Sequence, residues 1–393
     1  MNKNSLNHAF IYAFFRYSEI VFLGLSQFVL AHKVGPVELG KLAPFLLYYL
    51  YSNYFTLGSN LVFMKCYSGK VSYIKSGLFS YVSTATLLGL LMSLLVSVLL
   101  DYNLYVIFLI FFISILCNFG TAFLRVNELN KRLNYSSFSY SLTLVFIVYF
   151  FVTNSDDYLF AFLFCKSIQL IFIWRIDEFK IYFKNVKFFL HYQKMGVAML
   201  SSSIMFTLCL TFDRWVVIHT YSDSSIVGSY QLIETIGYSV FTALSVFAVF
   251  YYHQLLHFIK EDIFFRSRYL KFVCFIFFLS PIVAFLISWL AGEVVDLFYN
   301  KYSYSFSLIY SVILLKFLFF PVSLVSIYCQ AIGHNYRFAF VSIGSLVVSF
   351  LFFILIGYNG GIQRFPFIYS GVIFFFFLLF NVKELVSKSK GLI

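Results

Sequence analysis

Residues 211–238 read TFDRWVVIHTYSDSSIVGSYQLIETIGY, and this stretch contains two largely apolar runs with charged residues inside them. The charged residues within the runs are Asp213, Arg214 and Glu234. A charged side chain at membrane depth is costly, so such residues usually face a water-filled cavity or an oppositely charged partner. If the two runs span a membrane, these three residues are the first candidates for a functional role.

The composition of the whole chain places these runs in a membrane. Hydrophobic residues make up 61% of the 393 residues and charged residues only 11%, which is too few charges to cover a soluble globule of this size. Apolar runs of about 20 residues recur along the chain, and such a run crosses the hydrocarbon core as an α-helix. The sequence therefore predicts an all-α polytopic membrane protein with about 12 transmembrane helices. Their expected ranges are 9–31, 44–64, 76–100, 104–124, 135–153, 158–174, 196–218, 227–250, 269–291, 306–330, 337–357 and 365–382.

Most Lys and Arg residues lie on one side of the predicted membrane. Of the 28, 20 lie in segments on the same side as the N-terminus, 4 lie on the opposite side and 4 lie inside predicted spans. Cytoplasmic loops carry the excess of Lys and Arg, so both termini are expected in the cytoplasm. The net charge of +12 therefore reflects topology, and nucleic-acid binding is not expected.

Residues 175–195, RIDEFKIYFKNVKFFLHYQKM, separate six predicted spans from six others. Apolar residues recur in this segment at helical spacing opposite several lysines, which is typical of an amphipathic helix on an anionic membrane surface. The sequence therefore predicts an N-lobe at 1–174, a cytoplasmic amphipathic linker at 175–195 and a C-lobe at 196–393.

The two predicted lobes resemble each other weakly. HKVGPVELGK (32–41) follows the first predicted span and HTYSDSSIVG (219–228) follows the seventh, and in both a glycine opens the next span. These glycines are Gly40 and Gly228. An even number of spans in each half makes the repeat parallel, an arrangement known among secondary transporters.

VGPVELGKLA (34–43) and the DRW…VGSYQL stretch (213–232) resemble stretches of Wzx-type polysaccharide repeat-unit flippases. These flippases share the multidrug/oligosaccharidyl-lipid/polysaccharide (MOP) exporter superfamily with the MATE exporters. The resemblance implies a V-shaped pair of six-helix lobes around a cationic cavity in the bacterial inner membrane. It implies alternating access that moves an undecaprenyl-diphosphate-linked oligosaccharide, an O-antigen or capsule repeat unit, from the inner to the outer leaflet. It also implies the polysaccharide polymerase and the chain-length regulator as partners, beside membrane lipid.

Four cations inside the predicted spans are the candidate substrate-binding residues. The resemblance places Arg16 and Arg214 toward the cavity, whereas Lys166 and Lys316 are candidates because of their charge and mid-span position alone. In one lumen the four would form a cationic ladder, which suits a diphosphate because Arg forms bidentate bonds to phosphate oxygens. The alternative is structural, since either lysine can brace the helices of its own lobe.

Three carboxylates are the candidates for ion coupling, and the resemblance places Glu19, Asp213 and Glu234 toward the cavity. A buried carboxylate whose cationic neighbour changes between two states can take up and release a proton. Proton or sodium coupling is therefore expected, with Glu234 as its best candidate. Two structural alternatives stay open, because Glu19 lies three residues from Arg16 on one helix face and Glu234 can pair with Arg214.

The sequence contains no Gly-rich phosphate loop and no nucleophile elbow, and its Cys and His residues form no cluster at metal-ligand spacing. A transporter without cofactor, metal or catalytic step is therefore expected. Two other functions stay open. An O-antigen polymerase typically has a large outer loop, but the longest one here, near 292–305, is short. A MATE-like multidrug or cation exporter would have a mostly acidic lumen, whereas here four cations face three carboxylates.

Overall fold

The computed structural model describes residues 3–60, 62, 72–100, 102–127, 129–174, 186–356, 362 and 364–389. Over these residues the chain is helical and contains no strand, which confirms the predicted all-α class. Eight helical segments within the described residues are long and apolar enough to cross a membrane. The full number of spans and the side on which the termini lie stay predictions.

The chain divides into two compact units. Unit 1 comprises Met1–Val34 and Lys41–Leu200, and unit 2 comprises Gly35–Gly40 and Ser201–Ile393. The predicted lobe boundaries stay a prediction. Of the predicted linker, only 186–195 belong to the described residues, and they form the first turns of helix α7 (Val186–Thr220).

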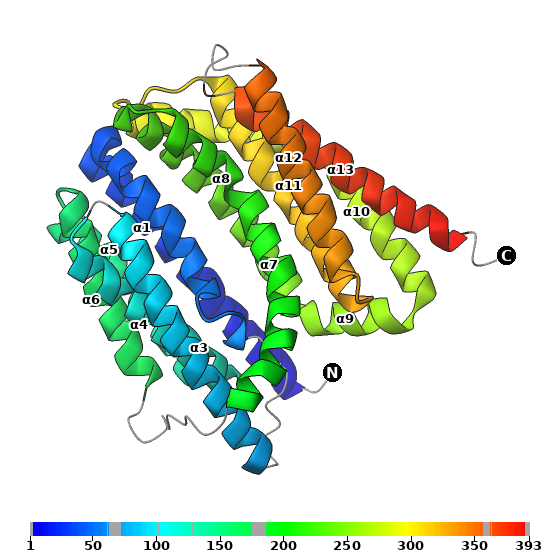
Figure 1. Ribbon diagram of the computed structural model, residues 1–393. Helices are drawn as coiled ribbons and strands as arrows, with labels where there is room; N and C mark the ends of the chain where they lie inside the picture. Colours follow the sequence, from blue (N-terminus) through cyan, green and yellow to red (C-terminus); the bar gives the residue numbers. More distant parts are fainter. Residues whose placement is uncertain are drawn as a thin grey trace. The chain divides into compact units, whose positions relative to one another are not determined.

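The described part of unit 1 is built from helices and one helical turn (Figure 1). They are most of α1 (Lys3–Tyr51), η1 (Ser52–Tyr54), α3 (Ser72–Leu99), α4 (Leu104–Val126), α5 (Asn130–Phe151), α6 (Ser155–Ile173) and the start of α7. Helix α4 packs against α3 and α6, and α6 also packs against α5. Because α6 contacts two neighbours, the side chains on its inner faces are buried, among them Lys166.

The first predicted outer loop, 32–41, is much shorter than expected. Helix α1 runs through it, and only Gly35 leaves helical geometry, with φ 77° and ψ 177°. Glycine adopts a positive φ without steric strain, and Pro36 then suits the first turn of the next helical segment, where its missing N–H is not needed. The polar residues of this stretch therefore belong to helix ends on both sides of a one-residue break.

The second predicted span, 44–64, is interrupted. Helix α1 ends at Tyr51, η1 follows, and Leu57 and Gly58 take positive φ values of 51° and 76°. A Cβ at Gly58 would lie 2.8 Å from the carbonyl oxygen of Gly196, so this turn fits closely against the start of α7. The apolar composition predicted a continuous helix, but the close approach and the glycine conformation break it.

Unit 2 is built around helix α11 (Phe306–Ala331), which packs against several other helices. In the most apolar segment of α11, 83% of the residues are buried, whereas in that of α12 only 28% are. The other helices are α8 (Ser224–Phe250), α9 (Tyr252–Glu261), α10 (Ile263–Phe298), α12 (Asn335–Ile356) and α13 (Arg364–Ser389), with the end of α7. The short α9, which the sequence analysis missed, runs across the ends of the long helices (Figure 1). A charged residue on α11 therefore lies in the core of the unit.

Two glycines at corresponding positions of the weak sequence repeat meet within unit 2. A Cβ at Gly40 would lie 1.8 Å from the carbonyl oxygen of Ser224, and a Cβ at Gly228 would lie 1.8 Å from that of Pro36. Each glycine thus faces the residue four positions before the other glycine. This reciprocal contact is what two repeat-related helix starts would make across a local two-fold axis, and no larger residue fits at either position.

We expect Gly228→Ala to lower the thermal stability of the protein, because the added methyl group forces the two backbones apart. Overpacking of this kind typically costs about 1–3 kcal/mol. Gly371→Ala is the matched control, since a Cβ there meets nothing within 4 Å and alanine favours a helix by up to about 1 kcal/mol over glycine. Equal thermal midpoints of the two variants, measured in detergent, would contradict the close contact.

Candidate functional site

Four charged side chains meet inside unit 2. Asp213 and Arg214 lie on α7, Glu234 on α8 and Lys316 on α11. Lys316 Nζ lies 2.8 Å from Asp213 Oδ1 and 3.1 Å from Glu234 Oε1. The Arg214 guanidinium pairs with Glu234 through Nη2. Three of the residues are fully buried and Arg214 is 6% exposed, so we call these four residues the charge network.

Neutral groups complete the charge network. The hydroxyl of Tyr230 donates to Asp213 Oδ2 at 2.6 Å, and Lys316 Nζ donates to the backbone oxygen of Leu210 at 2.7 Å. Tyr230 and Glu234 are four residues apart on α8, so helical periodicity places both on the face that meets α7 and α11. The sequence analysis missed Tyr230, although this spacing indicated it.

A glycine makes room for the central cation of the network. A Cβ at Gly237 would lie 3.0 Å from Lys316 Cγ and 3.2 Å from its Cβ. Gly237 lies three residues after Glu234 and thus on nearly the same face of α8. The missing side chain lets the stem of Lys316 pass along α8, so that its ammonium reaches both carboxylates.

Formal charge in the network sums to zero, because two cations face two carboxylates. Burying a charge is costly unless partners and hydrogen bonds compensate it, and here each charge has an opposite neighbour. Glu234 therefore forms the ion pair with Arg214 that the sequence analysis gave as the structural alternative to ion coupling. Arg214 Nε has no hydrogen-bond partner among the described residues, so its N–H group is available to donate to a ligand.

Lys166 has a different environment in unit 1. Its side chain is 8% exposed, its Nζ lies 2.8 Å from Gln169 Oε1, and the Tyr140 ring centroid is 4.0 Å away. The rings of Tyr49 and Phe162 follow at 5.6 and 5.8 Å. Among the described residues, no carboxylate lies within ion-pair distance of Nζ. A neutral amide and aromatic faces thus hold this ammonium.

The remaining candidates lie on α1. Glu19 is buried, with 8% exposure, whereas the side chain of Arg16 lies outside the described residues. The expected pairing of these two residues therefore stays a prediction, as does the place of Arg16 in a cationic ladder. In the described part of the chain, no group of three His, Cys, Asp or Glu side chains could hold a metal ion.

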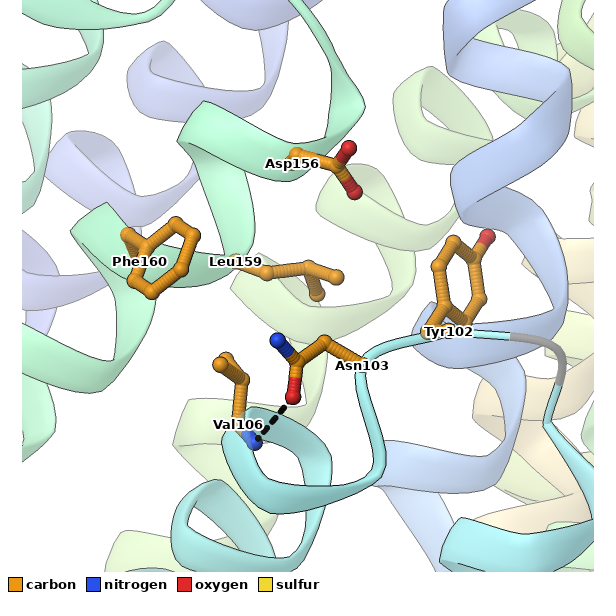
Figure 2. A pocket seen from close by; sticks show the side chains of 6 residues that line it. All are labelled: Tyr102, Asn103, Val106, Asp156, Leu159 and Phe160. Atoms are coloured by element: carbon orange, nitrogen blue, oxygen red, sulfur yellow. Dashed lines mark hydrogen bonds between the residues drawn. The ribbon is translucent and has the colours of Figure 1, made fainter.

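A separate cavity of about 360 Å³ lies between the start of α4 and the start of α6 in unit 1 (Figure 2). It is far along the chain from every residue of the charge network, and the sequence analysis did not indicate it. The lining residues are Tyr102, Asn103, Val106, Asp156, Leu159 and Phe160. Two polar groups, a carboxylate and an amide, thus face this cavity from different helices.

No family model and no curated protein matches this sequence. Solved structures match over nearly the whole chain. Lipid II flippase MurJ in an inward closed conformation has 17% identity and a TM-score of 0.68, covering 95% of this chain and 87% of that one. An inward-facing MATE family multidrug resistance transporter of the MOP superfamily has 14% identity and a TM-score of 0.62, covering 94% and 96%. An outward-facing one has 16% identity and a TM-score of 0.52, covering 96% of both chains.

These matches concern the fold, because the identities are low. The matched structures are membrane transporters and a flippase. Together with its membrane-length helices, the likeness identifies a multi-pass membrane protein. The chain therefore shares its fold with a MATE family transporter of the MOP superfamily and with lipid II flippase MurJ.

Proposed function

We propose that this protein is a Wzx-type flippase. It moves an undecaprenyl-diphosphate-linked O-antigen or capsule repeat unit from the inner to the outer leaflet of the bacterial inner membrane by alternating access. The polysaccharide polymerase and the chain-length regulator then act on the translocated unit. The fold likeness to a lipid II flippase supports a lipid-linked cargo, but the likeness to MATE transporters supports an exporter equally well. The choice between them therefore depends on the site.

The observation that favours an anionic cargo is the environment of Lys166. An ammonium bonded to a neutral amide and faced by aromatic rings keeps its positive charge without a carboxylate in contact. Such a charge, buried in the middle of a helix, attracts a diphosphate and repels a cationic drug. The Nε–H group of Arg214 is a second donor that can form a hydrogen bond to a phosphate oxygen.

Cells that lack the protein test this function directly. We expect single diphosphate-linked repeat units to accumulate on the inner leaflet, where an impermeant sugar-specific probe does not reach them until the membrane is permeabilised. Single units that reach the probe in intact cells would instead indicate a polymerase. If lipid-linked units do not accumulate, the flippase proposal is wrong, and drug and cation efflux by the same cells then tests the exporter.

Glu234→Gln tests the proposed proton or sodium coupling. The amide keeps the shape of the side chain but can neither bind a proton at neutral pH nor offer a charged ligand to sodium. We expect the dependence of translocation on pH or on sodium to change, as measured in vesicles with imposed gradients. Glu293→Gln, at an exposed carboxylate on α10, is the control. An unchanged profile in Glu234→Gln would leave that residue with a structural role only.

A further inference from the structure

The cavity between α4 and α6 presents a carboxylate that makes no hydrogen bond within the described residues. Asp156 lies in the first turn of α6, where Asn154 caps the helix by accepting from the backbone N–H of Asp157 at 2.9 Å. The Asp157 carboxylate in turn accepts from the N–H and hydroxyl of Thr153, and this hydroxyl holds the pKa of Asp157 below its ordinary value. Asp156 has no such partner among the described residues.

The second polar group of the cavity is an amide that can only donate. Asn103 Oδ1 accepts from the backbone N–H groups of Tyr105 and Val106, at 3.2 and 3.4 Å, as the cap of α4. These bonds fix the orientation of the amide, and Figure 2 shows its nitrogen directed toward Leu159. The nitrogen is therefore the part of Asn103 that is available to a ligand.

An aromatic ring and an apolar floor complete the cavity. The hydroxyl of Tyr102 donates to the backbone oxygen of Lys41, which ties the ring in place at one side. Leu159 and Val106 are buried, and the half-exposed Phe160 lines the cavity from α6. Among the described residues, no cationic side chain lines the cavity. A volume of about 360 Å³ lies within the range of small-molecule sites, which combine apolar walls with a few placed polar groups.

These groups select the chemistry of the ligand. The Asp156 carboxylate only accepts and the Asn103 amide nitrogen only donates, so the ligand must both donate and accept within one compact frame. An ammonium group only donates and an ionised phosphate only accepts, and the phosphate would also be repelled by the carboxylate. The hydroxyls of a sugar do both, and its C–H face can lie against a tyrosine ring.

We propose that this cavity is a saccharide-binding site, separate from the charge network and from Lys166. By the predicted topology, the starts of α4 and α6 lie on the side opposite the cytoplasm. The site would therefore hold a sugar of the repeat unit after its translocation, and this source of the sugar rests on the proposed function. The binding chemistry itself does not depend on transport.

The test uses the purified full-length protein and oligosaccharide released by mild acid from the surface polysaccharide of the cells that produce it. We expect saturable binding by ligand-observed NMR. Asp156→Asn and Asn103→Asp should weaken it about tenfold or more, since each removes one ligand-facing hydrogen-bonding function. Asn103→Asp keeps the oxygen that caps α4, so its loss of binding would not reflect a lost cap. Glu293→Gln, at an exposed carboxylate in unit 2, should bind normally.

Three outcomes would overturn the proposal. They are wild-type protein that does not bind the oligosaccharide, binding that both cavity variants retain, and binding of glycerophosphoethanolamine in its place, which would make the cavity a lipid head-group site. The leaflet assay in cells is independent of this measurement. A failed flippase assay with intact saccharide binding would remove the proposed function but keep the site. A successful flippase assay without saccharide binding would keep the proposed function but remove the site.

Discussion

Lys316→Met is expected to lower the free energy of unfolding by about 3–5 kcal/mol, because it leaves two buried carboxylates with one cation between them. Lys316 is fully buried on α11 and contacts both Asp213 and Glu234. Methionine fills a similar volume, so the loss comes from charge and not from a cavity. The measurement is the midpoint of heat-induced loss of the monodisperse protein in detergent, or of urea-induced unfolding.

A second substitution separates charge balance from packing. Lys316→Met combined with Asp213→Asn removes one charge of each sign and keeps the Arg214–Glu234 pair. Asn also keeps an oxygen that accepts from the Tyr230 hydroxyl. We expect this double variant to regain a large part of the lost stability. If it is as unstable as the single variant, charge balance does not explain the role of Lys316; Lys301→Met, at an exposed residue, is the neutral reference.

In contrast to Lys316→Met, Lys166→Met is expected to cause a large loss of translocation and a smaller loss of stability. The buried Glu19 carboxylate interacts with this ammonium electrostatically but makes no ion pair with it, so removing the ammonium costs less stability than breaking the ion pairs of Lys316. A lost charge-assisted contact to the substrate corresponds to about a 10- to 100-fold slower translocation. The measurement is the rate at which lipid-linked repeat units become accessible on the outer leaflet.

Lys166→Arg is the matched variant for this prediction, because it keeps the charge but changes the geometry of the donors. We expect it to retain part of the activity. If Lys166→Met translocates at the wild-type rate while its abundance in the membrane is normal, the lysine only braces unit 1. Comparing Lys316→Met with Lys166→Met therefore distinguishes a charge that is neutralised by buried carboxylates from a charge that is available to the substrate.

Composition and span length were sufficient to predict the fold class, because lipid imposes a helical backbone on any long apolar run. Details that depend on single conformations were not predictable in this way. The apolar run at 44–64 has the composition of one span, but η1 and the positive φ of Leu57 and Gly58 interrupt it. The expected loop at 32–41 has turn-forming residues, but Gly35 alone leaves the helix.

The candidate site was predicted in its residues but not in its contacts. Charge at membrane depth singled out Asp213, Arg214, Glu234 and Lys316, whereas spacing along the sequence relates only neighbours on one helix. Lys316 and Asp213 are in contact although they are 103 positions apart in the chain. Residue spacing within one helix cannot predict such a contact. The cations of unit 2 were therefore expected to face a lumen, and the structure shows them paired with carboxylates.

The reciprocal contact of Gly40 and Gly228 has a consequence for how this gene has evolved. At each of the two positions the backbone of the other segment occupies the space that a side chain would need, so a change at one position cannot be compensated by a side-chain change at the other. In aligned relatives we therefore expect glycine at both positions.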